Sequence, residues 1–332
     1  MECIRLTAGS IISEPVQRDI CTEAACSATI RIIIMRIRRE FLLPVAGIRF
    51  LPGKNIILTL LAGHTPEKER STRLLIILTA LNHSGLYYDL ASDCALLINA
   101  DTGKVLYAKN ENLRHANAST TKIMTCILAL DNSKMNETVK FSARATALEP
   151  TKLYARTGET FYMRDLLYSL MVPSHNDTAA AIAEHISGSQ SKFVSLMNKK
   201  AAQLGCTDTH FATPNGLDAG YTHYTTASDL AKIARYAIKK PAFRKIISTK
   251  SYSFKSLNTN RRFTVSTTNA LLGNMPGVIG MKTGYTNKAG HCFVGLCQSQ
   301  KGNTYISVVL GGPNSNARWR DSRILLNYAY KH

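Results

Sequence analysis

The sequence predicts an α/β domain of the α+β type, in which an antiparallel sheet is flanked by helices and joined to a mostly helical lobe. Strand patterns lie near both ends of residues 86–332, and helical patterns fill the region between them. Strands from the two ends of such a domain share one sheet. We therefore expect the first hairpin to join the last three strands, with the intervening helices forming the second lobe.

The first hairpin is indicated by a turn between two apolar runs. The sequence Asn-Ala-Asp-Thr-Gly at residues 99–103 separates the runs at 95–98 and 105–107. Gly-rich or polar turns also separate the three later apolar runs. These later strands are expected at residues 278–283, 291–297 and 305–310.

The helices are indicated by apolar residues at helical spacing and by stop signals. Pro173, Gly205 and Pro241 each follow such a pattern, where they end a helix. The expected helices cover residues 119–130, 163–171, 177–186, 193–204, 228–238 and, at the end of the chain, 319–330.

Residues 1–85 are expected to form a poorly structured leader, and residues 86–332 the folded domain. The apolar patches of the leader are interrupted by arginines, and none reaches the roughly 18 residues that a membrane span needs. Residues 73–85 combine a basic flank, a short apolar core and small or polar residues, which is the outline of a secretory signal or membrane segment. Because this segment starts far from Met1, a downstream translation start and a leader without targeting function both stay open.

The charge of the expected domain is strongly positive. Of 41 Lys and Arg and 22 Asp and Glu, 11 and 7 fall in residues 1–85, which leaves 30 and 15 for residues 86–332. A polyanion is the natural partner of such a surface. An anionic cell wall fits this charge, whereas no nucleic-acid motif accompanies it, so we expect no nucleic acid as partner.

The eight cysteines give no sign of a metal site. None forms a Cys-x-x-Cys pair, and none has a histidine at zinc-like spacing. We therefore expect no metal and interpret the cysteines in apolar runs as buried free thiols.

Ser119 and Lys122 form a Ser-x-x-Lys pair at the start of an apolar run. On a helix these two side chains share one face, within reach of a shared proton. Burial penalises the charged form of a lysine, so Lys122 can serve as the base that makes Ser119 a nucleophile. The alternative is that Ser119 caps the helix and Lys122 points to water.

Two further stretches carry polar residues at suggestive spacing. Ser174 and Asn176 lie two apart between helices, where they can face one site or simply cap the next helix. Lys282, Thr283 and Gly284 lie on an expected edge strand. Gly284 lets a substrate backbone approach, and Lys282 adds positive charge, unless the lysine is merely solvated.

Together the three stretches resemble a known family. Ser-x-Asn follows Ser119 by 55 residues, and Lys-Thr-Gly follows Ser174 by 108. This ordered set is that of the serine penicillin-recognising enzymes. Four segments resemble the low-molecular-weight penicillin-binding proteins that act as serine-type D-alanyl-D-alanine carboxypeptidases: Ala118-Ser-Thr-Thr-Lys-Ile-Met124, Ser174-His-Asn-Asp-Thr-Ala179, Thr213-Pro-Asn-Gly-Leu217 and Met281-Lys-Thr-Gly-Tyr-Thr-Asn-Lys-Ala-Gly290.

The resemblance implies a β-lactamase/DD-peptidase-like fold and a catalytic scheme. Ser119 would attack the carbonyl between the terminal D-alanines of a peptidoglycan stem peptide, and Lys122 would take its proton. Ser174, Asn176 and Lys282 would complete the proton route, while the N–H groups of Ser119 and Tyr285 would hold the oxyanion. Thr283, Gly284 and Arg318 would contact the substrate.

Other consequences of the resemblance concern partners and location. It implies β-lactam antibiotics as inhibitors and no metal or organic cofactor. It also implies export to the bacterial cell envelope, as a secreted or membrane-associated protein.

Two other functions are possible from the sequence. A β-lactamase of the same fold is disfavoured because the chain has no Glu after Glu184 to drive water onto the acyl-enzyme. A non-catalytic wall-binding protein would need one of the three motifs to be broken, and none is.

Overall fold

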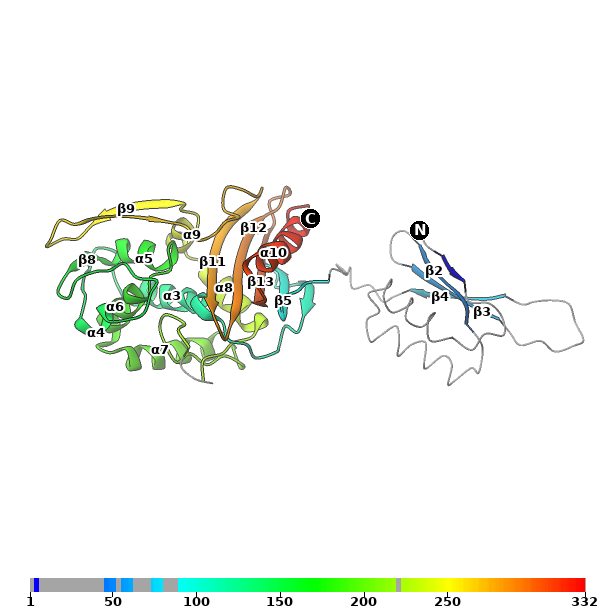
Figure 1. The fold of residues 1–332 in the computed structure, drawn as a ribbon, viewed down its shortest axis with the longest axis horizontal. Coiled ribbons are helices and arrows are strands. Elements are labelled where there is room, and N and C mark those ends of the chain that lie inside the picture. Colours follow the sequence, from blue (N-terminus) through cyan, green and yellow to red (C-terminus); the bar gives the residue numbers. More distant parts are fainter. Residues whose placement is uncertain are drawn as a thin grey trace, which may run out of the picture. The chain divides into compact units, whose positions relative to one another are not determined.

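The computed structural model describes residues 3–5, 45–51, 55–61, 73–79, 89–218 and 222–331. The chain divides into two compact units, Met1–Asp89 and Leu90–His332 (Figure 1). Among the described residues, no helix is both long enough and apolar enough to cross a membrane.

The first unit contains an antiparallel sheet with the strand order β1-β2-β3-β4. Its strands are β1 (Cys3–Arg5), β2 (Val45–Leu51), β3 (Asn55–Leu61) and β4 (Arg73–Thr79). These strands lie within the expected leader. The expected signal segment, 73–85, begins on β4, and its remainder lies outside the described residues. The leader and the signal therefore stay predictions.

Five antiparallel strands form the main sheet of the second unit, in the order β11-β12-β13-β5-β6. They are β5 (Cys94–Asn99), β6 (Val105–Lys109), β11 (Val278–Thr286), β12 (Gly290–Gln298) and β13 (Thr304–Gly312). Strand β13 pairs with β5, so that Val308 lies opposite Leu96. The predicted union of the first hairpin with the last three strands is confirmed, and β11 ends this sheet within the described residues.

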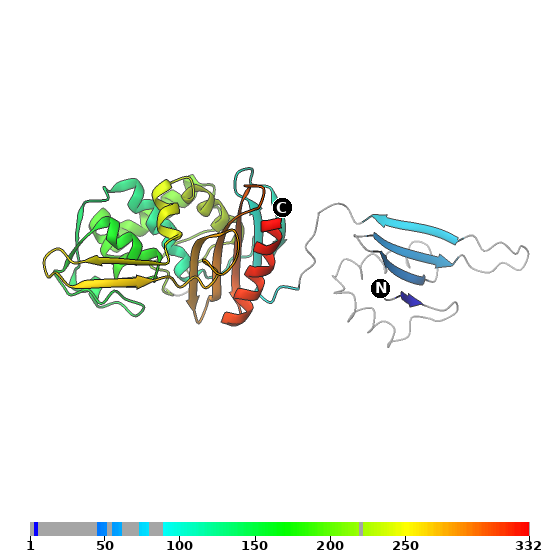
Figure 2. The ribbon, with the colours of Figure 1, turned by 90° about the horizontal axis from the view of Figure 1, so that it is seen from above.

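Helices cover both faces of the sheet because its central strands are apolar on both sides. All nine residues of β13 are buried. Helix α10 (Ser315–Lys331) packs its Leu325 and Ala329 against Leu97 and Val309. Figure 2 shows α10 along the sheet, on the side away from the helical lobe.

The helical lobe is built around α3 (Lys122–Asn132), whose first eight residues are all buried. A helix that is apolar on every side belongs inside a protein, and the other helices surround it. They are α4 (Ala143–Thr146), α5 (Met163–Met171), α6 (Asn176–Ser187), α7 (Gln190–Gln203), α8 (Ala227–Ala237) and α9 (Pro241–Ile247), accompanied by the short strands β7 (Thr138–Lys140) and β8 (Thr160–Tyr162).

The structure differs from the expected elements at three places. Ser119 does not start the long helix but lies on a separate 3-10 turn, η1 (Ala118–Thr121), which follows a left-handed residue, Ala118, with a φ of 45°. Pro241, expected only to end a helix, is the first residue of α9, where its missing N–H costs nothing. A hairpin of β9 (Ser251–Lys255) and β10 (Arg262–Ser266) was not expected, because each strand has only one buried residue.

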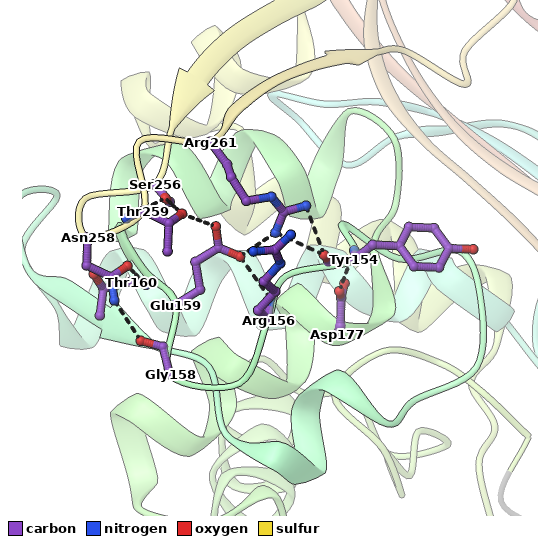
Figure 3. Close-up of polar contacts among 10 residues, drawn as sticks. All are labelled: Tyr154, Arg156, Gly158, Glu159, Thr160, Asp177, Ser256, Asn258, Thr259 and Arg261. Carbon is purple, nitrogen blue, oxygen red and sulfur yellow. Dashed lines mark hydrogen bonds and ion pairs between the residues drawn. The ribbon is translucent and has the colours of Figure 1, made fainter.

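The tip of the β9–β10 hairpin is tied to the helical lobe through Glu159 (Figure 3). The Glu159 side chain is fully buried and lies 2.7 Å from Arg261 Nη1. It also accepts hydrogen bonds from the Arg156 N–H at 2.8 Å and the Thr259 hydroxyl at 2.7 Å. Burial by itself would raise the pKa of Glu159, but these donors and the Arg261 charge outweigh it and hold the pKa below its usual value.

We expect Glu159→Gln to lower the free energy of unfolding by about 2 kcal/mol at pH 7, because it removes the charge from a buried, hydrogen-bonded pair. The pKa of Glu159 is lower in the folded state, so its contribution is fully present above the unfolded value of about 4.3 and is lost as the pH falls through the folded value. Urea unfolding followed by Trp319 fluorescence at pH 7 and at pH 3.5 measures the difference, since Trp319 is the single tryptophan and lies on α10.

The control is Glu149→Gln, because Glu149 is exposed and, among the described residues, takes part in hydrogen bonds through its backbone carbonyl and not its side chain. A destabilisation by Glu159→Gln that is equal at both pH values would contradict the role of the charge.

Candidate active site

Ser119 lies where the helical lobe meets the free edge of the sheet. Its turn, η1, packs against β11, and a Cβ atom placed on Gly284 would be only 3.0 Å from the Ser119 nitrogen. Glycine at this position therefore lets the strand approach the serine backbone. The Thr121 hydroxyl, two residues on, accepts hydrogen bonds from Asn117 Nδ2 at 2.9 Å and from His223 Nε2 at 2.8 Å, which fixes the turn.

The tautomer of His223 follows from its other contact. The Ala212 N–H donates to His223 Nδ1 at 3.0 Å, so the ring proton is on Nε2 and points at Thr121. Burial, and then the nearby His210 and Lys122, lower the pKa of His223 to about 4, which keeps the ring neutral.

The Lys122 amine is fully buried and lies among three oxygen atoms. Its Nζ is 2.8 Å from Ser119 Oγ, 2.7 Å from Asn176 Oδ1 and 2.7 Å from the Asn215 carbonyl oxygen. Two of these oxygens, on Asn176 and Asn215, can only accept hydrogen bonds. A neutral amine has two N–H groups for those two acceptors and one lone pair for the hydroxyl proton of Ser119. The geometry accommodates an uncharged Lys122 as the base for Ser119, and also an ammonium that donates to all three oxygens, so burial decides between the two forms.

The electrostatic environment also favours the uncharged form. Burial is the main cause that holds the pKa of Lys122 well below its usual value, and the positive charge of Lys282 adds to it, while Asp177 acts in the opposite direction. The expected alternative, in which Lys122 points to water, is excluded by its burial.

Ser174 lies in the connection between α5 and α6, in a left-handed conformation with a φ of 77°. Its hydroxyl oxygen is buried and has no hydrogen-bond partner among the described residues. An unpaired buried hydroxyl is costly, and such groups are concentrated at functional sites.

Asn176 is the first residue of α6 rather than part of the loop. Its side chain does not cap the helix. Its amide nitrogen donates to the carbonyl oxygens of Glu149 at 3.0 Å and Pro150 at 3.1 Å, while its oxygen faces the Lys122 amine. The amide therefore joins the lysine to the segment that begins at residue 149.

Lys282 and Thr283 lie on β11, and both are buried. The Lys282 amine donates to the Thr283 carbonyl oxygen at 2.9 Å, and the Thr283 hydroxyl is 2.6 Å from that of Thr268. Burial, followed by the positive charge of Arg318, lowers the pKa of Lys282 to about 7. The burial of Lys282 excludes its interpretation as a solvated lysine.

Arg318, on α10, is also largely buried rather than part of a solvated basic surface. Its guanidinium lies 4.3 Å from the centroid of the Trp319 ring, and Nη2 donates to the Ser315 hydroxyl at 3.3 Å. Nε is buried without a hydrogen-bond partner in the described part of the chain. A guanidinium held in this way has donors left for a ligand carboxylate.

The turn at 213–217 contributes a backbone atom to the site that the sequence does not predict. The pattern Thr-Pro-Asn-Gly-Leu predicts a turn, but it does not show that the Asn215 carbonyl reaches Lys122. Gly216, with a φ of 85°, brings the turn against the nucleophile's backbone, since a Cβ atom there would lie 1.9 Å from the Ala118 oxygen. Gly216 is the sequence feature that could indicate this close contact, because only a residue without a Cβ atom fits there.

A hollow of about 360 Å³ lies beyond the end of β11. Of the predicted site residues, its lining includes Tyr285 but neither serine, so the hollow adjoins the site rather than containing it. Among the described residues, no group of three or more His, Cys, Asp or Glu is placed to hold a metal ion.

Comparisons with known proteins agree with these motifs. The family model described as D-alanyl-D-alanine carboxypeptidase, peptidase S11, matches residues 80–314. The D-alanyl-D-alanine carboxypeptidase DacF of Bacillus subtilis is 39% identical over 243 residues, which are 71% of this chain and 61% of that protein. The D-alanyl-D-alanine carboxypeptidase of Streptomyces sp. strain K15 is 36% identical over 249 residues, 70% of this chain and 85% of that one.

The solved structures show the same relationship. The crystal structure of the Streptomyces K15 DD-transpeptidase has a TM-score of 0.70 and is 31% identical, covering 74% of this chain and 99% of that one. The predicted fold class and the resemblance drawn from the three motifs are thereby confirmed. The chain belongs to the D-alanyl-D-alanine carboxypeptidase family, peptidase family S11.

Proposed function

We propose that this protein is a serine-type D-alanyl-D-alanine carboxypeptidase, which removes the terminal D-alanine from peptidoglycan stem peptides and is acylated by penicillin. The observation that carries the proposal is the 2.8 Å approach of the fully buried Lys122 amine to Ser119 Oγ, with the Asn176 and Asn215 oxygens as its two other close contacts. Such a pair is a nucleophile with its own base.

In the acylation step, Lys122 accepts the hydroxyl proton of Ser119, and Oγ attacks the carbonyl carbon of the penultimate D-alanine. The backbone N–H groups of Ser119 and Tyr285 stabilise the oxyanion. The bond to the terminal D-alanine nitrogen then breaks, and that nitrogen receives a proton through Ser174. The unpaired buried hydroxyl of Ser174 supports this role.

In the deacylation step, water attacks the ester and releases the shortened peptide. Asp177 is a buried carboxylate whose charge acts to raise the pKa of Lys122. Its oxygens already accept hydrogen bonds from the N–H groups of Leu153, Tyr154 and Thr178. It is therefore poorly suited to drive water as the glutamate of a class A β-lactamase does. This supports a peptidase over a β-lactamase, and the three intact motifs support an enzyme over a non-catalytic wall-binding protein.

The acyl acceptor can be water or an amine. The Streptomyces K15 relative is named a carboxypeptidase in one comparison and a DD-transpeptidase in the other. We assign water to this chain. D-alanine leaves in the acylation step with either acceptor, so the peptide product formed in the presence of an added D-amino acid distinguishes hydrolysis from transfer to the amine.

The proposed substrate places the protein at the cell envelope. We propose that it is secreted or membrane-associated there, with the anionic cell wall as a further partner. The support is the excess of 30 basic over 15 acidic residues in residues 86–332.

We expect a fluorescent penicillin to label the protein, and Ser119→Ala to abolish the label, because the acyl-enzyme forms on this hydroxyl. Lys122→Arg keeps a cation but cannot accept the proton, so acylation should slow by about 10²–10⁴-fold. Stopped-flow acylation and gel fluorescence measure both variants. Labelling that survives Ser119→Ala would refute the assignment, and near wild-type acylation of Lys122→Arg would refute the base.

We expect the C-terminal carboxylate of the substrate to contribute through Arg318. Amidation of that carboxylate should remove a charge-assisted hydrogen bond of about 1.5–3 kcal/mol. This corresponds to about one to two decades in kcat/KM. The measurement compares D-alanine release from diacetyl-Lys-D-Ala-D-Ala with D-alaninamide release from its amide.

Two variants on α10 test whether Arg318 is the residue that recognises the carboxylate. Arg318→Gln should reduce the ratio between the two substrates toward one, whereas Arg323→Gln, an exposed position on the same helix, should leave it unchanged. A ratio that is the same in Arg318→Gln and in the wild type would remove Arg318 from carboxylate recognition.

A further inference from the structure

Two exposed tyrosines lie on segments that carry or contact residues of the candidate active site. Tyr154 is 63% exposed and Tyr285 is 55% exposed, and they are among four exposed large apolar side chains in the described part of the chain. Tyr285 follows the Lys-Thr-Gly motif on β11. Tyr154 belongs to the helical lobe, on the segment that receives the hydrogen bonds of Asn176. The proposed function gives Tyr285 a role but leaves Tyr154 without one.

The backbone around Tyr154 is bound to the start of α6. Asp177 accepts hydrogen bonds from the N–H groups of Leu153 at 2.9 Å and Tyr154 at 3.0 Å. The Asn176 N–H donates to the Thr151 carbonyl oxygen at 2.7 Å. Asn176 also contacts the Lys122 amine. The Tyr154 backbone is therefore hydrogen-bonded to Asp177, the sequence neighbour of a residue in the catalytic cluster.

The same backbone is held from the other side by the β9–β10 hairpin. Arg261, which forms the buried pair with Glu159, also donates to the Tyr154 carbonyl oxygen at 3.5 Å. A carboxylate thus binds the N–H of Tyr154 and a guanidinium binds its C=O. Figure 3 shows the ring pointing away from the Glu159 cluster and past Asp177.

Tyr154 adopts a conformation that a bulky residue rarely has. Its φ is 58°, in the left-handed region that glycine or asparagine fills at lower cost. Strain of this kind persists only where the surroundings impose it, and it is concentrated at functional sites. The chain nevertheless carries a large aromatic ring here and exposes most of it, with the Lys152 amine 5.3 Å from the ring centroid.

We propose that Tyr154 is a specificity-determining residue, whose ring packs against the aliphatic side chain of the stem-peptide residue that precedes the two D-alanines. This inference rests on the proposed function. The two D-alanines offer only methyl groups, which cannot cover an aromatic ring. The preceding residue is the first in the substrate that can offer an aliphatic chain longer than a methyl group.

The fixed backbone explains why one ring can be selective. The backbone N–H and C=O groups of Tyr154 are both hydrogen-bonded, so substrate binding does not have to order the segment. A tyrosine side chain has few rotatable bonds and supplies a large apolar contact at low entropic cost. Differences of a few methylene groups against such a surface discriminate substrates by about tenfold or more.

The experiment compares two peptides, diacetyl-Lys-D-Ala-D-Ala and acetyl-Ala-D-Ala-D-Ala, in the full-length protein. We expect the wild type to favour the lysine peptide by about tenfold in kcat/KM. Tyr154→Asn removes the ring while asparagine tolerates the left-handed backbone, so the preference should fall toward one and the short peptide should be cleaved at the wild-type rate. Tyr154→Phe should keep the preference, because the ring makes the contact.

Two controls separate this inference from the proposed function and from misfolding. Val105→Ala changes an exposed apolar residue on β6, at the opposite edge of the sheet from β11, and should leave the preference unchanged. Penicillin acylation of Tyr154→Asn at the wild-type rate shows that the catalytic cluster is intact.

The outcomes are distinct. If Tyr154→Asn keeps the wild-type preference, or if the wild type has none, the inference is wrong while the carboxypeptidase assignment stands. If Tyr154→Asn loses penicillin acylation and both peptides equally, the residue supports the fold and not the specificity. If the wild type cleaves neither peptide, the proposed function itself fails.

Discussion

The burial of the Lys122 amine is the constraint on which the rest of the active site depends. Removing an ammonium group from water is costly, so the amine is stable here as a neutral group with its two N–H donors satisfied. Its acceptors come from the start of α6 and from the turn at 213–217, and its third neighbour comes from η1. These three segments are far apart in sequence, and the packing of the helical lobe around α3 is what brings them to one nitrogen atom.

Positive charge acts in sequence from α10 through β11 to this amine. Arg318 helps to lower the pKa of Lys282, and Lys282 helps to lower the pKa of Lys122, although burial is the larger cause in both lysines. The result is a group of three basic side chains that affect one another's protonation, in which burial favours the uncharged form of both lysines. A substrate that ends in a carboxylate suits such a group, which is the electrostatic support for an enzyme acting on a chain terminus.

The parts of the site that depend on side-chain type and local spacing could be predicted from the sequence. The Ser119–Lys122 pair could be predicted because neighbours three apart on a helical turn always lie close. The Asn215 carbonyl could not, since every residue has one and only the fold selects it. The left-handed Tyr154 was missed for a related reason, because its conformation is imposed by Asp177 and Arg261, which follow it by 23 and 107 residues. The β9–β10 hairpin escaped detection since it buries little apolar surface.

The identity of residue 176 shows how closely the chemistry and the Tyr154 segment are linked. Its oxygen faces the Lys122 amine, and its nitrogen donates to the carbonyl oxygens of Glu149 and Pro150. An aspartate would have the same shape but no donor, which would leave two carbonyls unpaired at the start of the segment. It would also place a negative charge beside the amine, which stabilises the ammonium form and removes the base. An uncharged amide satisfies both requirements, so the residue that accepts a hydrogen bond from Lys122 without adding charge is also the one that anchors the segment carrying Tyr154.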